Sequence, residues 1–273
     1  MNVHTVQGGG GVRLQVREWG SPSGRPILLI HGWSQNHLCW MMQSESKLLE
    51  RFRMVAFDLR GHGESEAPSH ADAYTSGDVW ADDIAEIIRG LRLEKPVLVG
   101  WSYGGFVIGD YLRKYGQKEI ASVGFVAGAV VLGAKAFGTL IGPGFLENAP
   151  SACALDVATN QAAMRRFVRA CIVKPIPQKV FDAVLEFNML VSPQVRGFLI
   201  QRELDFTDAL EQLTRPVLVT QGRADTVVLP AMSEYIVNHC RGAQISWFDE
   251  VGHAPFLEAP ERFDRELATF ASC

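Results

Sequence analysis

Runs of apolar residues alternate with amphipathic stretches along most of the chain. Several of the apolar runs are continuous, which is typical of strands covered on both faces of a sheet. The predicted strands are residues 13–18, 26–30, 54–58, 96–99, 122–126, 217–221 and 244–248. Residues 76–91 carry apolar side chains at helical spacing, with acidic residues early and arginines late, as the helix dipole favours. This alternation predicts an α/β fold with a mostly parallel, doubly wound sheet.

The alternation of strands and helices stops between residues 133 and 212. Helical patterns broken by prolines recur there, at residues 161–171, 178–190 and 193–201. A structureless connection of this length is uncommon in a compact domain. We therefore predict a core domain of residues 1–132 and 213–273 and a helical insertion of residues 133–212, called the insertion below. It is expected to form a lid over the carboxyl edge of the sheet, where ligands of open α/β sheets bind.

Composition narrows the class of protein. The chain has 273 residues, of which 47% are hydrophobic and 21% charged, as in ordinary folded proteins. Its net charge of -4 and its scattered basic residues argue against a nucleic-acid partner. The longest apolar stretch, residues 121–136, is interrupted by glycines and too short for a membrane span. The N-terminus lacks the pattern of a signal peptide, so we expect a cytoplasmic protein, with a homo-oligomer possible.

The five cysteines are widely spaced and odd in number. This pattern predicts neither a disulfide framework nor a metal site, and free thiols are expected.

One serine lies between glycines directly after a predicted strand. Residues 96–99 lead into Gly100-Trp101-Ser102-Tyr103-Gly104 and then into an apolar helical stretch. A serine hydroxyl is a weak nucleophile that needs exposure, a base and donors for the oxyanion it creates. Gly-x-Ser-x-Gly is typical of a sharp strand-to-helix turn that exposes the serine, because other side chains would clash there. Ser102 is the predicted nucleophile, and a structural serine in a glycine-rich turn is the alternative.

A second loop follows the strand 26–30 and begins with His31-Gly32-Trp33. The backbone N–H of Trp33 can join that of Tyr103, the residue after the serine, to form an oxyanion hole. His31 is expected to be a structural residue of this loop and not a base.

The base is expected to be a histidine near the C-terminus. His253 follows the strand 244–248 and holds the last place in the chain order serine, acid, histidine. Asp225 follows the strand 217–221 and is the predicted acid, which would fix the tautomer of the imidazole. Two alternatives stay open: Asp225 could cap the next helix, and Asp249 or Glu250 could serve as the acid instead.

These motifs give the sequence a resemblance to the α/β-hydrolase superfamily over nearly its whole length. The motifs are His31-Gly32, residues 58–65, the turn around Ser102, residues 222–225 and Gly252-His253. Trp33, Trp40 and Ala81-Asp82-Asp83 resemble the small serine esterases grouped with cofactor-free haloperoxidases and perhydrolases. In that group proline is common where this chain has Ser34. A serine nucleophile disfavours the dehalogenase and epoxide-hydrolase branches, which use an aspartate.

The resemblance implies a serine hydrolase that cleaves a carboxylic ester, or a related acyl bond, of a small apolar molecule through an acyl-enzyme on Ser102. Aromatic side chains near the turn and in the insertion are predicted to contact this substrate: Trp101, Phe137, Phe145 and Phe187. Each of them could instead be a core residue. The chemistry needs no metal and no organic cofactor. Perhydrolysis, a cofactor-free dioxygenase reaction and a ligand-binding role with little turnover stay open as alternatives.

Overall fold

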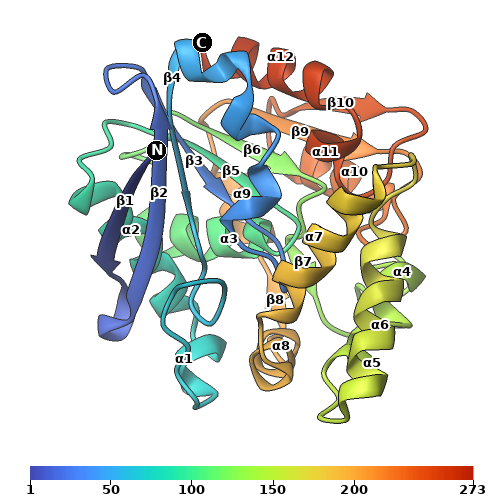
Figure 1. Ribbon diagram of the computed structural model, residues 1–273. Helices are drawn as coiled ribbons and strands as arrows, with labels where there is room; N and C mark the ends of the chain where they lie inside the picture. Colours follow the sequence, from blue (N-terminus) through green and yellow to red (C-terminus); the bar gives the residue numbers. More distant parts are fainter. Residues whose placement is uncertain (273) are drawn as a thin grey trace.

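The computed structural model describes residues 1–272 and contains a central eight-stranded sheet (Figure 1). The strands are β1 (Asn2–Gln7), β2 (Arg13–Gly20), β3 (Arg25–Ile30), β4 (Phe52–Phe57), β5 (Val97–Trp101), β6 (Ser122–Val126), β9 (Val217–Gly222) and β10 (Gln244–Phe248). Their order in the sheet is β1-β2-β4-β3-β5-β6-β9-β10. β2 pairs antiparallel with β1 and β4, and all later neighbours are parallel. The predicted α/β fold with a mostly parallel sheet is confirmed.

Each predicted strand is present, with ends within two residues of the prediction. The pattern did not predict β1, whose side chains are exposed or half-buried because it lies at the edge of the sheet. A short antiparallel pair, β7 (Val131–Leu132) and β8 (Leu204–Asp205), lies apart from the main sheet and joins the two ends of the insertion.

Helices cover both faces of the sheet. Outside the insertion they are η1 (Gly9–Gly11), η2 (His37–Trp40), η3 (Gln43–Glu45), η4 (Lys47–Glu50), α1 (Asp72–Thr75), α2 (Gly77–Gly90), α3 (Gly104–Tyr115), α10 (Pro230–His239), α11 (Pro255–Glu258) and α12 (Pro260–Ala271). The connection from β3 to β4 runs across the sheet toward β1, whereas the connection from β4 through α2 to β5 runs toward β10. Since crossovers between parallel strands are right-handed, η2–η4 and α2 lie on opposite faces. α3 contacts α2, and α12 contacts η4.

The insertion contains the helices that the sequence predicts and three short ones that it does not. They are α4 (Pro143–Leu146), α5 (Ala149–Ala152), α6 (Val157–Ala170), α7 (Gln178–Met189), α8 (Pro193–Ile200) and α9 (Thr207–Gln212). α6 begins four residues before its predicted start because the Asp156 carboxylate caps it, accepting a hydrogen bond from the Thr159 N–H at 2.8 Å. Figure 1 shows α4–α8 grouped away from β1 and β2. No helix within residues 1–272 has the length and apolar character to cross a membrane.

The strand order places a crevice at the carboxyl edge of the sheet. The chain leaves β3 toward β4 and leaves β5 toward β6, which lie on opposite sides of this central strand pair. The loops after β3 and β5 therefore diverge, and ligands of open α/β sheets bind at such a point. The loop after β3 begins at His31, and the turn after β5 holds Ser102.

Candidate active site

Ser102 occupies a strained turn between β5 and α3. Its φ is 54°, in the left-handed region that costs a non-glycine residue of order 1–3 kcal/mol. The turn is held because the Ser102 N–H donates to the Val126 carbonyl at 3.1 Å and the Ser102 carbonyl accepts from Ala129 N–H at 3.0 Å. A Cβ on Gly104 would lie 2.5 Å from the Ile30 carbonyl oxygen, so only glycine fits there. The turn therefore places Ser102 where the loops after β3 and β5 diverge.

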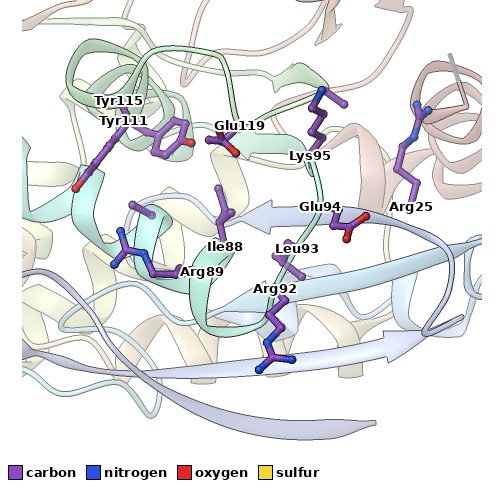
Figure 2. A pocket seen from close by; sticks show the side chains of 12 residues that line it. Arg25, Ile88, Arg89, Arg92, Leu93, Glu94, Lys95, Tyr111, Tyr115 and Glu119 are labelled. Atoms are coloured by element: carbon purple, nitrogen blue, oxygen red, sulfur yellow. The ribbon is translucent and has the colours of Figure 1, made fainter.

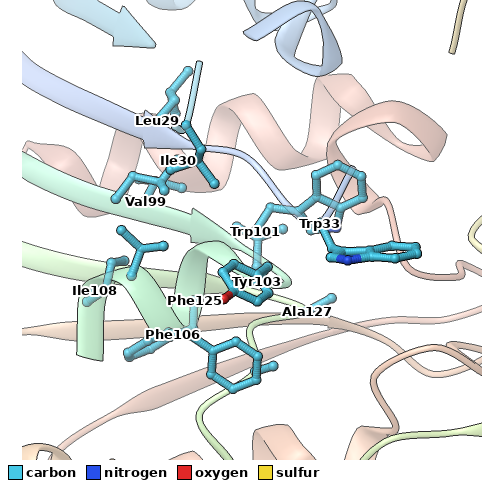
Figure 3. Close-up of a cluster of buried hydrophobic side chains, with 14 of the residues drawn as sticks. Leu29, Ile30, Trp33, Val99, Trp101, Tyr103, Phe106, Ile108, Phe125 and Ala127 are labelled. Carbon is cyan, nitrogen blue, oxygen red and sulfur yellow. The ribbon is translucent and has the colours of Figure 1, made fainter. Parts of the chain in front are cut away.

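The loop after β3 lies directly against this turn. A Cβ on Gly32 would be 3.0 Å from the Ser102 Cβ. Within residues 1–272, neither the Trp33 N–H nor the Tyr103 N–H donates a hydrogen bond to another residue. Figure 3 shows the side chains of Trp33 and Tyr103 among the buried apolar residues at the ends of β3 and β5. Two free amides beside the serine are what an oxyanion hole requires.

His253 and Asp225 meet across 28 residues of sequence. The His253 Nδ1 lies 2.7 Å from the Asp225 Oδ2, and both side chains are almost fully buried. Because the carboxylate accepts this bond, Nδ1 carries the proton and the neutral imidazole keeps a lone pair on Nε2. The Nε2 atom is buried and has no partner within the described residues. A ring nitrogen left unpartnered in this way is able to accept a proton.

Asp225 does not cap the next helix. Its Oδ1 accepts from the Val227 and Val228 N–H groups at 2.8 and 3.1 Å, while α10 starts later, at Pro230. The rival acid Asp249 pairs with Arg223 at 2.9 Å and its side chain is 80% exposed. Of the three candidate acids, Asp225, Asp249 and Glu250, only Asp225 is hydrogen-bonded to His253 within the described residues.

Two contacts that the sequence did not predict hold this pair in place. Gln221 Nε2 donates to the Asp225 Oδ2 at 3.0 Å, and Gln221 is fixed by the Ser233 hydroxyl at 2.7 Å. The Trp101 indole N–H donates to the His253 carbonyl at 2.8 Å. Gln221 carries one signal in the sequence, since it is a polar residue near the end of a buried strand. The Trp101 bond has no local signal because its partner lies 152 residues away.

His31 is a structural residue, as expected. Its Nδ1 donates to the Gly32 carbonyl at 2.8 Å, and its Nε2 accepts from the Leu59 N–H at 3.0 Å. Both ring nitrogens are occupied, and burial lowers the pKa of His31 to about 4. The neighbouring His62, 5.1 Å away between ring centroids, has a pKa lowered to about 3, again mainly by burial. Neither ring is placed to act as the base.

A narrow apolar cavity opens on Ser102. The space open to a water centre is about 30 Å³, room for one or two waters. Most of the lining residues belong to the core. The insertion adds Ile141, Phe145 of α4 and Ile200 of α8. The cavity is lined by Trp33, Ser102, Tyr103, Phe106, Ala129, Leu132, Ile141, Phe145, Ile200, Val227 and Val228.

The four aromatic residues predicted to contact substrate lie in three different places. Phe145 lines the cavity at Ser102 and packs edge-on against Trp33, with ring centroids 5.4 Å apart. Trp101 and Phe187 line a second small apolar cavity, which does not include Ser102. Phe137 lines neither cavity and is 44% exposed, because the turn through Gly138 leaves its ring on the outer surface.

A much larger hollow, about 850 Å³, lies at the opposite edge of the sheet (Figure 2). It surrounds the amino ends of β3 and β5 and carries mixed charges, among them Arg92, Lys95, Glu94 and Glu119. It contains none of the residues described above, so its size does not make it the reactive site.

A doubly wound sheet with a serine on a strained turn at its switch point, and with a carboxylate-bound histidine in the loop after β10, is typical of the class of α/β hydrolases. The alpha/beta hydrolase family matches residues 27–266, and the chain belongs to this family.

Solved structures and curated relatives agree with this class. A crystal structure from Burkholderia cenocepacia, assigned as an aryl esterase, has 34% identity and a TM-score of 0.94, covering 99% of this chain and 98% of that one. The esterase RhEst1 from Rhodococcus sp. ECU1013 has 30% identity and a TM-score of 0.94, covering 100% and 99%. A non-heme chloroperoxidase of Streptomyces lividans is 26% identical over 97% of this chain and 98% of its own length. The predicted resemblance to esterases and non-heme haloperoxidases is confirmed.

Proposed function

We propose that this protein is a serine esterase that cleaves a carboxylic ester of a small, mainly apolar molecule. The observation that carries the proposal is the buried, unpartnered Nε2 of His253, whose Nδ1 is bound to Asp225 at 2.7 Å. The position of Ser102 at the switch point and the similarity to esterases support it.

In the proposed reaction, the His253 Nε2 takes the Ser102 proton while the hydroxyl oxygen attacks the ester carbonyl. Asp225 holds the imidazole in the required tautomer and stabilises its protonated form. The Trp33 and Tyr103 N–H groups bind the oxyanion. His253 then gives its proton to the leaving alcohol, which leaves an acyl group on Ser102. Water activated by the same imidazole releases the acid and restores the free serine.

The cavity suggests which substrates fit. Its lining is apolar, so it suits a hydrocarbon group, and its volume of about 30 Å³ favours short acyl chains. Phe145 comes from the insertion, and we propose that movement of this part of the insertion admits larger groups. In this role the insertion, residues 133–212, acts as a cap over the core.

The experiment is hydrolysis of p-nitrophenyl esters from acetate to octanoate, with a fluorophosphonate label located by mass spectrometry. We expect turnover of the short esters and a label on Ser102. Ser102→Ala should reduce kcat by about 10⁵-fold or more, because the nucleophile is removed. Ser151→Ala, a half-buried serine of α5, is the matched control and should keep full activity. A folded Ser102→Ala protein with near wild-type activity would disprove the assignment.

Perhydrolysis is a second candidate, favoured by the similarity to a non-heme chloroperoxidase. In that reaction peroxide replaces water at the acyl-enzyme and yields a peracid, which can oxidise bromide. Bromination of monochlorodimedone in acetate, bromide and hydrogen peroxide tests for it, and the activity should vanish in Ser102→Ala. A cofactor-free dioxygenase would retain its reaction in Ser102→Ala and lose it in His253→Ala. A ligand-binding protein would show no turnover in any variant.

A further inference from the structure

Arg196, in α8 of the insertion, is fully buried and has no carboxylate partner within residues 1–272. Other buried arginines differ in this respect. Arg60 pairs with Asp83 at 2.7 Å, and Arg202 pairs with Asp110 at 2.8 Å. A buried cation without a counter-ion is costly, so its presence calls for a specific physical explanation.

All five N–H groups of the Arg196 guanidinium are used within the protein. The acceptors are Ser34 Oγ, Ala152 O, Asn160 Oδ1, Asn188 O and Met189 Sδ. Ala152 ends α5, and Asn188 lies in the last turn of α7, where helix carbonyls carry partial negative charge. Burial lowers the pKa of Arg196 to about 10, so it stays charged at neutral pH. No donor is left to bind a substrate carboxylate, and the side chain instead joins three helices and one loop.

That loop is the one that carries the Trp33 amide. Arg196 Nε donates to the Ser34 hydroxyl oxygen at 2.8 Å, and this hydroxyl donates to the Asn188 carbonyl at 3.0 Å. The Trp33 indole N–H donates to the Arg196 carbonyl at 3.2 Å, and Gln35 Nε2 donates to Asn188 Oδ1 at 3.1 Å. Three consecutive loop residues are thus tied to the insertion. Ser34 has a φ of 59°, a left-handed conformation that its surroundings must maintain.

We propose that Arg196 is a positioning residue for the oxyanion hole. Through the Ser34 hydroxyl and its own carbonyl, it fixes the loop so that the Trp33 N–H points at the place where the ester oxyanion forms. This inference rests on the proposed function, because it takes the Trp33 amide as an oxyanion donor. An oxyanion donor stabilises the transition state only when it is held within about 2.7–3.1 Å of the oxyanion. The insertion then shapes the pocket and also sets the geometry of the reacting centre.

The test compares Arg196→Met, Arg196→Lys and Ser34→Ala by kcat and KM on p-nitrophenyl acetate. For Arg196→Met we expect kcat to fall about 10- to 100-fold with KM changed less than about threefold, because a donor displaced by about 1 Å can cost that much. Arg196→Lys should recover part of the lost kcat, since lysine keeps the positive charge but lacks the planar set of five donors of the guanidinium. Ser34→Ala should lower kcat less. Combining it with Arg196→Met should add little, because both variants remove the same bond.

The inhibition constant of a transition-state analogue is a second measurement, and it would not change if Arg196 had a merely structural role. A trifluoromethyl ketone adds to Ser102 and places an oxyanion in the hole, so its inhibition constant should rise in parallel with the loss of kcat. Phe181→Leu is the control, because Phe181 is a buried residue of α7 without a recorded bond to the loop. Phe181→Leu should lower the melting temperature. Its kcat and its inhibition constant, measured at a temperature where every variant is folded, should equal those of the wild type.

The outcomes separate this inference from the proposed function. Arg196→Met with kcat and inhibition constant within twofold of wild type would overturn the inference, even if Ser102 carries the label. A loss matched by Phe181→Leu at equal destabilisation would also overturn it, because general loosening of the insertion would explain both. Wild-type activity that persists in Ser102→Ala would instead overturn the proposed function, and the inference with it.

Discussion

The loops at the carboxyl edge of the sheet and the helices of the insertion meet at Ser102, but different forces hold them. The edge loops depend on backbone geometry, as the strained φ of Ser102 and the contact of Gly104 with the Ile30 carbonyl show. The insertion reaches the same cavity through apolar side chains such as Phe145 and Ile200. Backbone geometry tolerates few substitutions, whereas apolar packing tolerates many of similar volume.

This difference separates two kinds of expected effect. Changes at the edge loops should alter the rate for every substrate, because they move or remove reacting groups. Changes in the insertion should alter the preference among substrates, because they reshape the space around a constant chemistry. Arg196 is the proposed exception, since it belongs to the insertion but is hydrogen-bonded to an edge loop.

The largest effect after loss of the nucleophile is expected at the acid. Asp225→Asn should lower kcat about 10⁴-fold, because an amide cannot hold His253 in the same tautomer. The measurement is kcat on p-nitrophenyl acetate. Asp249→Asn, at the exposed acid paired with Arg223, is the matched control and should stay within twofold of wild type. The reverse order of effects would move the acid to Asp249.

An intermediate effect is expected in the insertion. Phe145→Ala enlarges the cavity at Ser102, so the ratio of kcat/KM for octanoate over acetate should rise about tenfold, as one or two extra methylenes fit. Phe137→Ala removes an exposed ring of the same kind, eight residues earlier, and should leave the ratio unchanged. The ester panel measures both. Equal ratios in the two variants would show that α4 does not set chain-length preference.

The last expected effect is on stability and not on rate, and it is a pH dependence from the structural histidines of the edge loops. Burial lowers the folded-state pKa of His62 to about 3, below the unfolded value of about 6.5. The unfolded chain therefore binds a proton that the folded one does not, and stability falls as pH drops from about 6.5 toward 3. One such group contributes up to roughly 1.4 kcal/mol per pH unit.

Replacing this histidine should flatten the pH profile. His62→Asn keeps a donor for the Arg60 carbonyl and cannot titrate, so its urea-unfolding free energy should fall less between pH 6.5 and 4.5. His70→Asn, at an exposed histidine, controls for the loss of a surface imidazole and should follow the wild type. A profile for His62→Asn parallel to the wild type would show that His62 is not kept neutral in the folded protein.

Much of the fold and of the candidate site could be predicted because their signals are local. The apolar runs of the central strands mark a sheet buried on both faces. The glycines around Ser102 are demanded by the turn itself, whatever surrounds it. β1 escaped prediction for the opposite reason, since none of its side chains is fully buried and no apolar run marks it.

The tertiary structure decided which residues surround those reactive groups. The sequence alone determined a parallel α/β sheet, a serine on a strand-to-helix turn and the order serine, acid, histidine, because each follows from short-range geometry or chain order. It could not separate Phe145 from Phe137, because both are aromatic residues of one apolar segment and only packing places one at the cavity. Nor could it join Arg196 to Ser34 across 162 residues. A hydrogen bond between distant segments depends on where the whole chain brings them together, and no local pattern encodes it.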